Sequence, residues 1–329
     1  MSDEIDDVLQ TLEYRLYVRR ILTILGVAGV VAVAYFGTQF LGVKVDDLAR
    51  QFPTWLQSLN AFLSPDFVDF TSYSKENEIH GWDGLFASLG NPGSLLTSLT
   101  SQQGIVGASV ITIVIGVTGT ILGFPLALLF GVLGSERVTP FPFNFIFRGT
   151  MSTIRAVPAL VWILIFIPLA GISPVSAMLA VATDTIGNLG RLFTDELEEI
   201  QEGPIEAIRS TGASSPQVVS FGMLSQVSSS FIAWTLYILE INTRIAISLG
   251  VVGAGGIGQY ISLRIDLFAF SRAAAGLIMV VFIVLTVELT SSRIRAYLRP
   301  EEEAGGGLLA SIKSLGDVNK WIGRDTGQQ

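Results

Sequence analysis

The chain contains no cysteine and only one histidine in 329 residues. Without cysteine it forms no disulfide and has no thiolate for catalysis or metal binding. The histidine, His80, lies in an acidic stretch with no second histidine nearby, so we expect no metal site. These absences exclude a disulfide-stabilised domain and thiol chemistry, and they disfavour a metal centre.

Charged residues are also scarce, at 15% of the chain, whereas half of all residues are hydrophobic. This is more apolar surface than one water-soluble core needs, so we predict an all-α polytopic membrane protein. A span needs about 20 mostly apolar residues. About six segments are candidate transmembrane helices: 21–41, 106–133, 155–171, 174–191, 227–250 and 273–290. Gly171-Ile-Ser-Pro174 predicts a tight hairpin between the third and fourth.

The positions of lysine and arginine predict the topology. With a cytoplasmic N-terminus, 14 cations lie inside, 5 lie outside and Arg244 lies within a span. Cytoplasmic segments are enriched in cations, so we expect both termini in the cytoplasm. Ala32-Val-Ala34 is similar to a signal-peptide cleavage site, but it lies in the middle of an apolar run. We therefore expect a retained anchor and a multi-pass protein of the plasma membrane.

Three regions are expected along the chain. Residues 1–105 comprise an N-terminal cytoplasmic segment, the first span and an extracytoplasmic part, in which amphipathic stretches such as Trp55–Leu63 form a short cap or interfacial helices. Residues 106–299 form the membrane core, and residues 300–329 form a cytoplasmic linker and tail. The net charge of −8 argues against a nucleic-acid partner.

One polar stretch between spans, Glu206-Ala-Ile-Arg-Ser-Thr-Gly212, predicts a short helix. Gly203 is expected to break what precedes the helix, Pro204 suits the first helical position, and Gly212 suits a left-handed end. Ile205 and Ile208 share one face. About eight residues make a helix of ~12 Å, which is unstable alone in water, so it needs a partner surface. The alternative is an ordinary connecting loop.

Polar residues within the predicted spans form two pairs. Glu240 and Arg244 are four residues apart, as are Asp184 and Asn188, so each pair shares a helix face. Ionisable groups in a bilayer are costly unless they are paired or face water. The pair Glu240–Arg244 is therefore either a salt bridge that holds the bundle together or, with Asn242, part of a translocation pathway for an anion. Asp184 and Asn188 either line the same cavity or bond across to the helix of Glu240.

Glycines recur in two patterns. The first is a small face of Gly119, Gly123, Ala127 and Gly131, which predicts close helix packing. The second has the spacing of a dinucleotide site, but it follows a membrane span and lacks the acidic residue expected at position 278, so we reject that function. We expect instead a flexible extracytoplasmic gate loop beside the pathway exit, formed by Gly253, Gly255, Gly256 and Gly258.

Several motifs occur in a fixed order between residues 106 and 299. They are Arg155-Ala-Val-Pro158, Asp184-Thr-Ile-Gly-Asn-Leu-Gly-Arg-Leu-Phe193, Glu206-Ala-Ile-Arg-Ser-Thr-Gly-Ala213, Glu240-Ile-Asn-Thr-Arg244 and Gly250-Val-Val-Gly-Ala-Gly-Gly-Ile-Gly-Gln259. The series resembles the permease subunit of phosphonate-type ABC importers. Within it, residues 202–226 resemble the EAA loop of such permeases, with Glu206, Ala207, Gly212 and Leu224 at matching positions. Ile208 replaces the second alanine, Gly222 the usual isoleucine and Ser225 the final proline.

The resemblance implies a type I ABC-importer permease architecture and transport of phosphonate or a related phosphorus oxyanion by alternating access. It implies cytoplasmic ATP-binding subunits that grip the EAA loop, an extracytoplasmic substrate-binding protein and a second, identical or related permease. The chain has no Gly-x4-Gly-Lys-Ser/Thr loop, so we expect ATP-Mg on the partner ATPase and no enzyme activity in this chain.

Other interpretations remain open. One is an importer for another small solute, such as phosphate, phosphite, an amino acid or a metal complex. Another is an ion-coupled secondary transporter that uses Asp184 or Glu240 as its coupling site. A third is a membrane scaffold that transports nothing.

Overall fold

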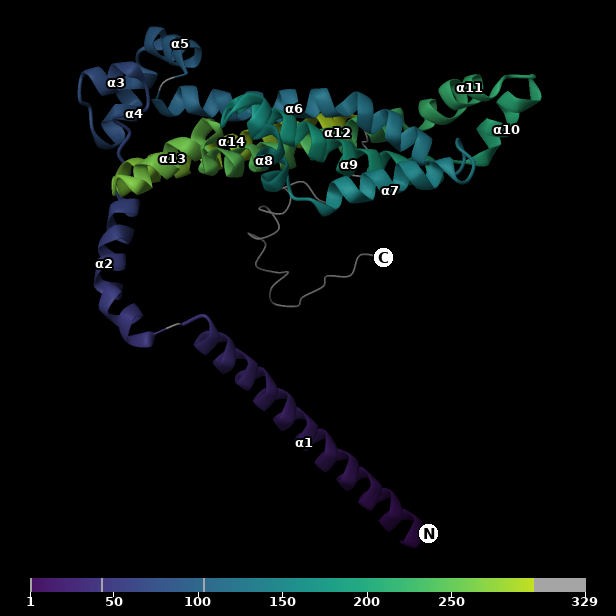
Figure 1. Ribbon diagram of the computed structural model, residues 1–329. Helices are drawn as coiled ribbons and strands as arrows, with labels where there is room; N and C mark the ends of the chain where they lie inside the picture. Colours follow the sequence, from purple (N-terminus) through teal and green to yellow (C-terminus); the bar gives the residue numbers. More distant parts are fainter. Residues whose placement is uncertain (1, 43, 103, 299–329) are drawn as a thin grey trace, which may run out of the picture. The chain divides into compact units, whose positions relative to one another are not determined.

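The computed structural model describes residues 2–42, 44–102 and 104–298, and every regular element in these ranges is a helix (Figure 1). The all-α prediction is confirmed for this part of the chain. The helices belong to two compact units, Met1–Asn60 and Ala61–Gln329.

The first unit contains the long helix α1 (Ser2–Phe40) and most of α2 (Val45–Leu63). Within Tyr14–Phe40, α1 contains an 18-residue stretch with a mean hydropathy of 2.1 and is long enough to cross a membrane. Nearly all of its described side chains are exposed. The predicted first span is therefore a helix that begins well before residue 21.

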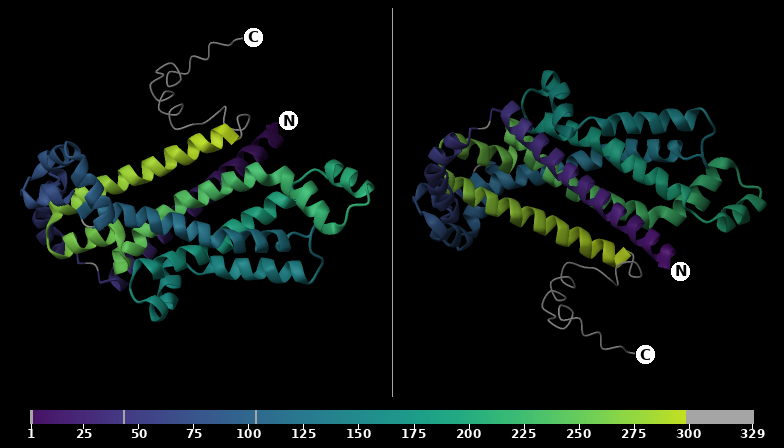
Figure 2. Two further views of the ribbon diagram at one scale, coloured as in Figure 1. Left: turned by 90° about the horizontal axis from the view of Figure 1, so that it is seen from above. Right: turned by 90° about the horizontal axis from the view of Figure 1, so that it is seen from below.

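The second unit is built around two helices that lie side by side, α6 (Gly104–Gly134) and α9 (Pro174–Glu198) (Figure 2). Their contact is the small face predicted from the sequence. A Cβ atom on Gly123 would lie 2.5 Å from the carbonyl oxygen of Ala182, and one on Gly119 would lie 2.6 Å from Cγ1 of Val181. Larger side chains would force the helices apart, so the packing prediction is confirmed.

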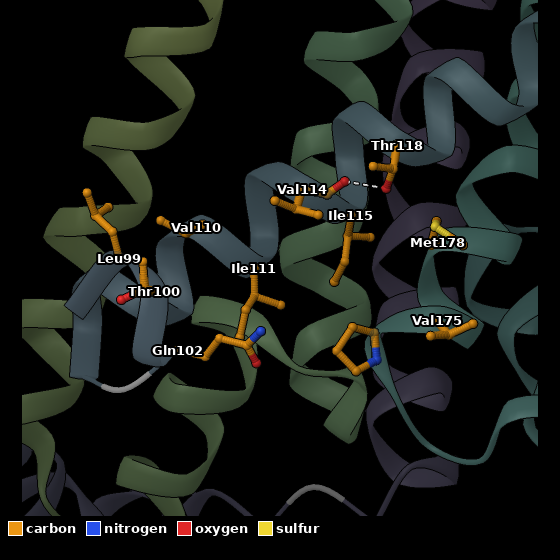
Figure 3. A pocket seen from close by; sticks show the side chains of 11 residues that line it. Leu99, Thr100, Gln102, Val110, Ile111, Val114, Ile115, Thr118, Val175 and Met178 are labelled. Carbon is orange, nitrogen blue, oxygen red and sulfur yellow. Dashed lines mark hydrogen bonds between the residues drawn. The ribbon is translucent and has the colours of Figure 1, made fainter. Parts of the chain in front are cut away.

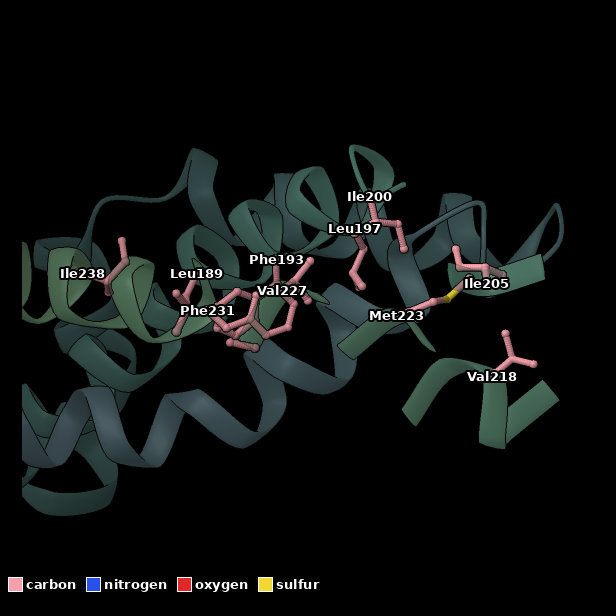
Figure 4. Close-up of a cluster of buried hydrophobic side chains, with 11 residues drawn as sticks. Leu189, Phe193, Leu197, Ile200, Ile205, Val218, Met223, Val227, Phe231 and Ile238 are labelled. Carbon is pink, nitrogen blue, oxygen red and sulfur yellow. The ribbon is translucent and has the colours of Figure 1, made fainter. Parts of the chain in front are cut away.

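Two further long helices complete this bundle. Helix α12 (Leu224–Leu249) packs against both α6 and α9, and α14 (Phe270–Leu298) packs against α12. Between α9 and α12 the rings of Phe193 and Phe231 stack with centroids 3.9 Å apart. This stack lies within a continuous apolar cluster that runs along both helices (Figure 4).

The region between α6 and α9 is a bent pair of helices followed by a hairpin. Helices α7 (Phe143–Ala156) and α8 (Ala159–Ala170) meet at 92°. The bend occurs where Val157, which precedes Pro158, adopts an extended conformation, as expected before proline. The predicted hairpin at 171–174 is present, with Gly171 at φ 69°.

Four helices among the described residues are long and apolar enough to cross a membrane, or five if α7 and α8 form one broken span. They are Tyr14–Phe40, Gly104–Gly134, Ser215–Ala254 and Phe270–Tyr297. Helix α9 is long enough, but polar residues such as Asp184 and Asn188 lower its hydropathy. A total of six spans, with both termini in the cytoplasm, stays a prediction.

The predicted extracytoplasmic segment contains three short helices: α3 (Ser72–Glu76), α4 (Gly81–Leu89) and α5 (Pro92–Ser101). Phe67 and Phe70 are buried in one apolar cluster with Ile257 of α13 (Gly256–Asp266). Beside this cluster, the buried carboxylate of Asp69 lies 2.8 Å from the Arg264 guanidinium. Helices α3–α5 thus form a cap that is folded with the second unit, and the unit boundary lies at residue 60.

Candidate coupling helix and transport cavity

The predicted short helix is present as α10 (Glu202–Ser210). It begins two residues before Pro204, because a helix leaves its first N–H groups without intrahelical partners and so tolerates proline in the first turn. Gly212 follows the C-cap residue Thr211 and has φ 81°, which confirms the predicted left-handed end.

Helix α10 buries apolar side chains along one face. Ile205 is 1% exposed and lies in the apolar cluster that includes Val218 and Met223 (Figure 4). Ile208 is partly buried against the same cluster. Burying an isoleucine side chain stabilises a fold by about 1.5–3 kcal/mol, which supplies the support that so short a helix needs. Glu206 and Ala207 are exposed. The helix therefore presents a free surface built from matching positions of the EAA loop.

Two of the three departures from the EAA pattern, Ile208 and Gly222, lie against each other. A Cβ atom built on Gly222 would lie 3.2 Å from Cδ1 of Ile208. The long side chain at position 208 thus occupies the space that a side chain at position 222 would need. Leu224, the matching leucine, packs on the same cluster from the start of α12.

The ion pair Glu202–Arg137 ties α10 to the segment after α6, and contacts of Arg137 and Arg148 with Glu198 extend this network to α9 and α7. Arg137, just after α6, lies 2.6 Å from the carboxylate of Glu202 and donates a 2.8 Å hydrogen bond to the carbonyl oxygen of Glu198, in the last turn of α9. Arg148 of α7 pairs with the Glu198 side chain and donates a 2.7 Å hydrogen bond to Gly134. A displacement of α10 would therefore act on α6, α7 and α9 together.

A polar cavity of about 430 Å³ lies between α7, α9 and α12. It brings together the predicted residues Asp184 and Asn188, which are joined by a 2.9 Å hydrogen bond. Arg155 donates to Asn188 at 3.3 Å, and Arg191 pairs with Asp195 at 2.9 Å. The sequence analysis did not assign Arg155, Arg191 or Asp195 to a site, although the i,i+4 spacing of Arg191 and Asp195 was a usable signal.

Glu240 and Arg244 form the predicted ion pair, but they lie on a different face of α12 from this cavity. They face α14, where Arg244 lies 3.6 Å from Glu288 and Glu240 lies 3.9 Å from Arg295. The structure therefore separates this charged cluster from Asp184 and Asn188. Glu240 is buried, whereas the Arg244 side chain is about half exposed at 49%.

Asn242 is completely buried between three helices. Its amide donates 2.8 Å hydrogen bonds to the hydroxyls of Thr120 in α6 and Thr185 in α9. Through these contacts Asn242 holds α12 against α6 and α9. Its assignment to a translocation pathway stays a prediction.

The glycine-rich loop after α12 is closely packed. Gly253, Gly255 and Gly256 have φ values of 96°, 95° and 73°, where residues with a Cβ atom are strained. The N–H of Ile257 donates a 2.8 Å hydrogen bond to the hydroxyl of Thr112 in α6. A side chain at Gly258 would collide with α12. Packing and backbone angles, rather than flexibility, explain these glycines, and their role as a gate stays a prediction.

A second cavity, of about 240 Å³, lies between α5, α6 and the start of α9 (Figure 3). Its wall is mostly aliphatic, including Val110, Ile111 and Val175, and the Thr118 hydroxyl is engaged by the Val114 carbonyl within α6. No charged residue lines it. An anion would find no partner there, so the polar cavity is the better candidate for transport. Among the described residues, no cluster of three or more potential metal ligands occurs.

Comparison with known proteins gives the family. Residues 119–302 match the model of the binding-protein-dependent transport system inner membrane component. A putative phosphite transport system permease protein of Stutzerimonas stutzeri is 31% identical over 56% of this chain and 65% of its own length. The phosphate-import permease protein of Mycolicibacterium smegmatis is 34% identical over 57% of this chain and 35% of its own length. The chain thus spans less than two thirds of each of these two relatives.

Two further comparisons agree. A putative cryptic phosphonate transport system permease protein of Escherichia coli is 37% identical over 36% of this chain and 98% of its own length. The crystal structure of an amino acid ABC transporter with histidines superposes with a TM-score of 0.51 at 13% identity, covering 62% of this chain and 96% of that one. At that identity the superposition supports a shared fold only. Together with the apolar helices, the family match makes this a multi-pass membrane protein.

Proposed function

The chain belongs to the inner membrane components of binding-protein-dependent transport systems, and from this premise we propose that it is the permease subunit of an ATP-driven importer for a phosphorus oxyanion. The relatives named for phosphite, phosphate and phosphonate transport support this class of substrate. A binding protein outside the membrane would deliver the anion, and a second permease, identical or related, would complete the pathway.

The observation that carries the proposal is the one-sided burial of α10. Its apolar face, at Ile205 and Ile208, packs against other helices of this chain, whereas the face at Glu206 and Ala207 is exposed. We propose that a cytoplasmic ATPase subunit, which binds ATP-Mg, grips this open face. Six spans with both termini in the cytoplasm would place α10 on the same side as the ATPase.

The polar cavity supports a route for an anion. Arg155 and Arg191 supply two positive charges beside Asp184 and Asp195. An oxyanion entering this cavity would exchange its water shell for guanidinium donors, while the carboxylates keep the empty site neutral. Closure of the ATPase pair would move α10 and, through Arg137 and Arg148, the helices that surround the cavity.

Uptake by cells with and without this chain tests the substrate class. We expect loss of phosphonate, phosphite or phosphate uptake when the chain is deleted, and restoration by the wild-type chain. Arg155→Gln should restore much less uptake than the control Arg293→Gln, whose side chain is exposed and does not line the cavity, at equal membrane levels. Unchanged uptake of all three anions but lost uptake of an amino acid or metal complex would overturn the substrate class.

The energy source is tested separately. Gly212→Leu strains the left-handed end of α10 and should insert normally but lose copurification with the ATP-binding subunit. Gly203→Ala is the matched control, since a side chain there meets no atom within 4 Å and Gly203 has an ordinary helical φ. Uptake that needs no ATP-binding subunit and collapses with an uncoupler would favour an ion-coupled transporter instead.

A further inference from the structure

Helix α2 carries an apolar face that has no partner in the described part of its own unit. Leu48, Phe52, Trp55 and Leu56 are 61%, 54%, 54% and 43% exposed. Their spacing of three and four residues places them on one side of the helix. Scattered exposed apolar residues are ordinary, but a continuous stripe of this size marks an interaction surface.

The opposite side of α2 is polar. Arg50, Thr54 and Gln57 lie about half a turn away from the stripe and are also exposed. A helix with this division fits a boundary between an apolar and an aqueous phase. It does not fit a bilayer span, which would bury its charges, nor a free helix in water, which would leave the stripe exposed.

The connection to α1 indicates which boundary this is. The apolar part of α1 ends at Phe40, and α2 begins at Val45. The four residues between them reach at most about 14 Å, and the headgroup region is ~5–8 Å thick on each side of the hydrocarbon core. If α1 crosses the membrane, α2 therefore begins at or close to the membrane surface.

The composition of α2 indicates what holds it there. The rings of Phe52 and Trp55 lie next to each other with centroids 5.4 Å apart, and tryptophan concentrates at the membrane–water interface. Asp46, Asp47 and Arg50 give the helix a net charge of −1, so attraction to anionic lipid does not hold it there. We propose that α2 lies in the bilayer interface, with its stripe toward the acyl chains, and that it binds zwitterionic lipid through apolar burial.

The absence of native cysteine allows a direct test in the full chain. Single variants Phe52→Cys and Leu56→Cys, and the polar-face controls Arg50→Cys and Gln57→Cys, would each carry one nitroxide label in phosphatidylcholine vesicles. At positions 52 and 56 we expect collisions with oxygen to exceed those with a water-soluble nickel chelate severalfold. At positions 50 and 57 we expect the reverse. Addition of anionic lipid should leave this pattern unchanged.

Three outcomes would overturn the proposal. Low accessibility to both reagents at 52 and 56 would show that protein covers the stripe, and dipolar broadening between labels would identify that protein as a second copy of the chain. High chelate accessibility on both faces would place α2 in water. Immersion that occurs only with anionic lipid would show that charge, rather than apolar burial, holds the helix.

Discussion

At the residue scale, the function depends on polar groups whose neighbours are set by helix packing. The i,i+4 spacing predicted the pairing of Glu240 with Arg244, because both partners lie on one helix. It did not predict the hydrogen bond between Asp184 and Asn188, two residues that we expected to line a common cavity or to bond across to α12. Spacing could not predict that α12 directs Glu240 toward α14 and Asn242 toward α6. Those directions depend on how α12 is rotated against its neighbours, which one sequence does not specify.

Asn242 and Asn188 should therefore respond differently to truncation. Asn242→Ala removes two buried hydrogen bonds between helices and leaves a small void, which should cost about 1–3 kcal/mol. Asn188→Ala removes partly exposed contacts in the polar cavity and should cost much less stability, but it should lower anion uptake. Thermal unfolding of the purified permease and uptake per folded molecule measure the two effects. Equal stabilities for the two variants would contradict the packing role of Asn242.

Asp66 should make the cap sensitive to acid. Burial alone would raise the pKa of its carboxyl, but hydrogen bonds from His80 and from the backbone N–H groups of Gly81 and Val68 outweigh burial and lower the pKa. A depressed pKa stabilises the fold above the unfolded value of about 3.9, and this stabilisation is lost as the pH falls through the folded value.

Asp66→Asn should accordingly be less stable than wild type at pH 7, and the difference should shrink as the pH falls below about 3.9 and vanish below the lowered folded pKa of Asp66. Denaturant unfolding at a series of pH values measures this difference. A stability difference between variant and wild type that stays constant across the pH range would show that the charge of Asp66 does not stabilise the fold.

At the element scale, two features decide how closely helices pack: small residues at the contact, and side chains whose sizes fit each other across it. The four-residue period of small residues in α6 predicted a close contact, and α9 is the helix that fills it. The sequence did not identify α9 as the partner. It also placed the start of α10 too late, because the first turn tolerates both Gly203 and Pro204 without a local signal.

Gly123→Ala should disrupt the α6–α9 contact. The added methyl group meets backbone at 2.5 Å, so the helices must separate, at a cost of about 1–3 kcal/mol. Gly149→Ala in α7 meets nothing within 4 Å and should be neutral or slightly stabilising. Thermal stability of the two variants in the same detergent makes the comparison. Equal thermal stabilities of the two variants would contradict the close approach of α6 and α9.

Ile208 and Gly222 should compensate for each other. Ile208→Ala alone opens a space beneath α10, and Gly222→Ile alone collides with Ile208. The double variant restores the alanine and isoleucine of the EAA pattern and should regain most of the ATPase copurification that each single variant loses. Losses that simply add in the double variant would show that the two sites are independent.

At the scale of the whole molecule, the position of α10 is coupled to the positions of several long helices. The apolar face of α10 joins α9 and α12 through one continuous cluster, and the ion pair Glu202–Arg137 links it to the segment after α6. Arg148 in turn joins α7 to the ends of α6 and α9. Composition and hydropathy predicted a multi-pass helical protein, and motif order predicted its family. They could not give the number of spans, because polar residues in α9 and the bend between α7 and α8 weaken the apolar signal of both segments.

The central claim is that the open face of α10 contacts a cytoplasmic ATP-binding subunit. Crosslinking from single cysteines in this cysteine-free chain measures that contact most directly. Glu206→Cys should crosslink to the ATP-binding subunit in membranes, whereas Ile205→Cys, one residue away on the buried face, should not. Crosslinks from position 206 that reach only lipid, or equal yields from both positions, would contradict the account.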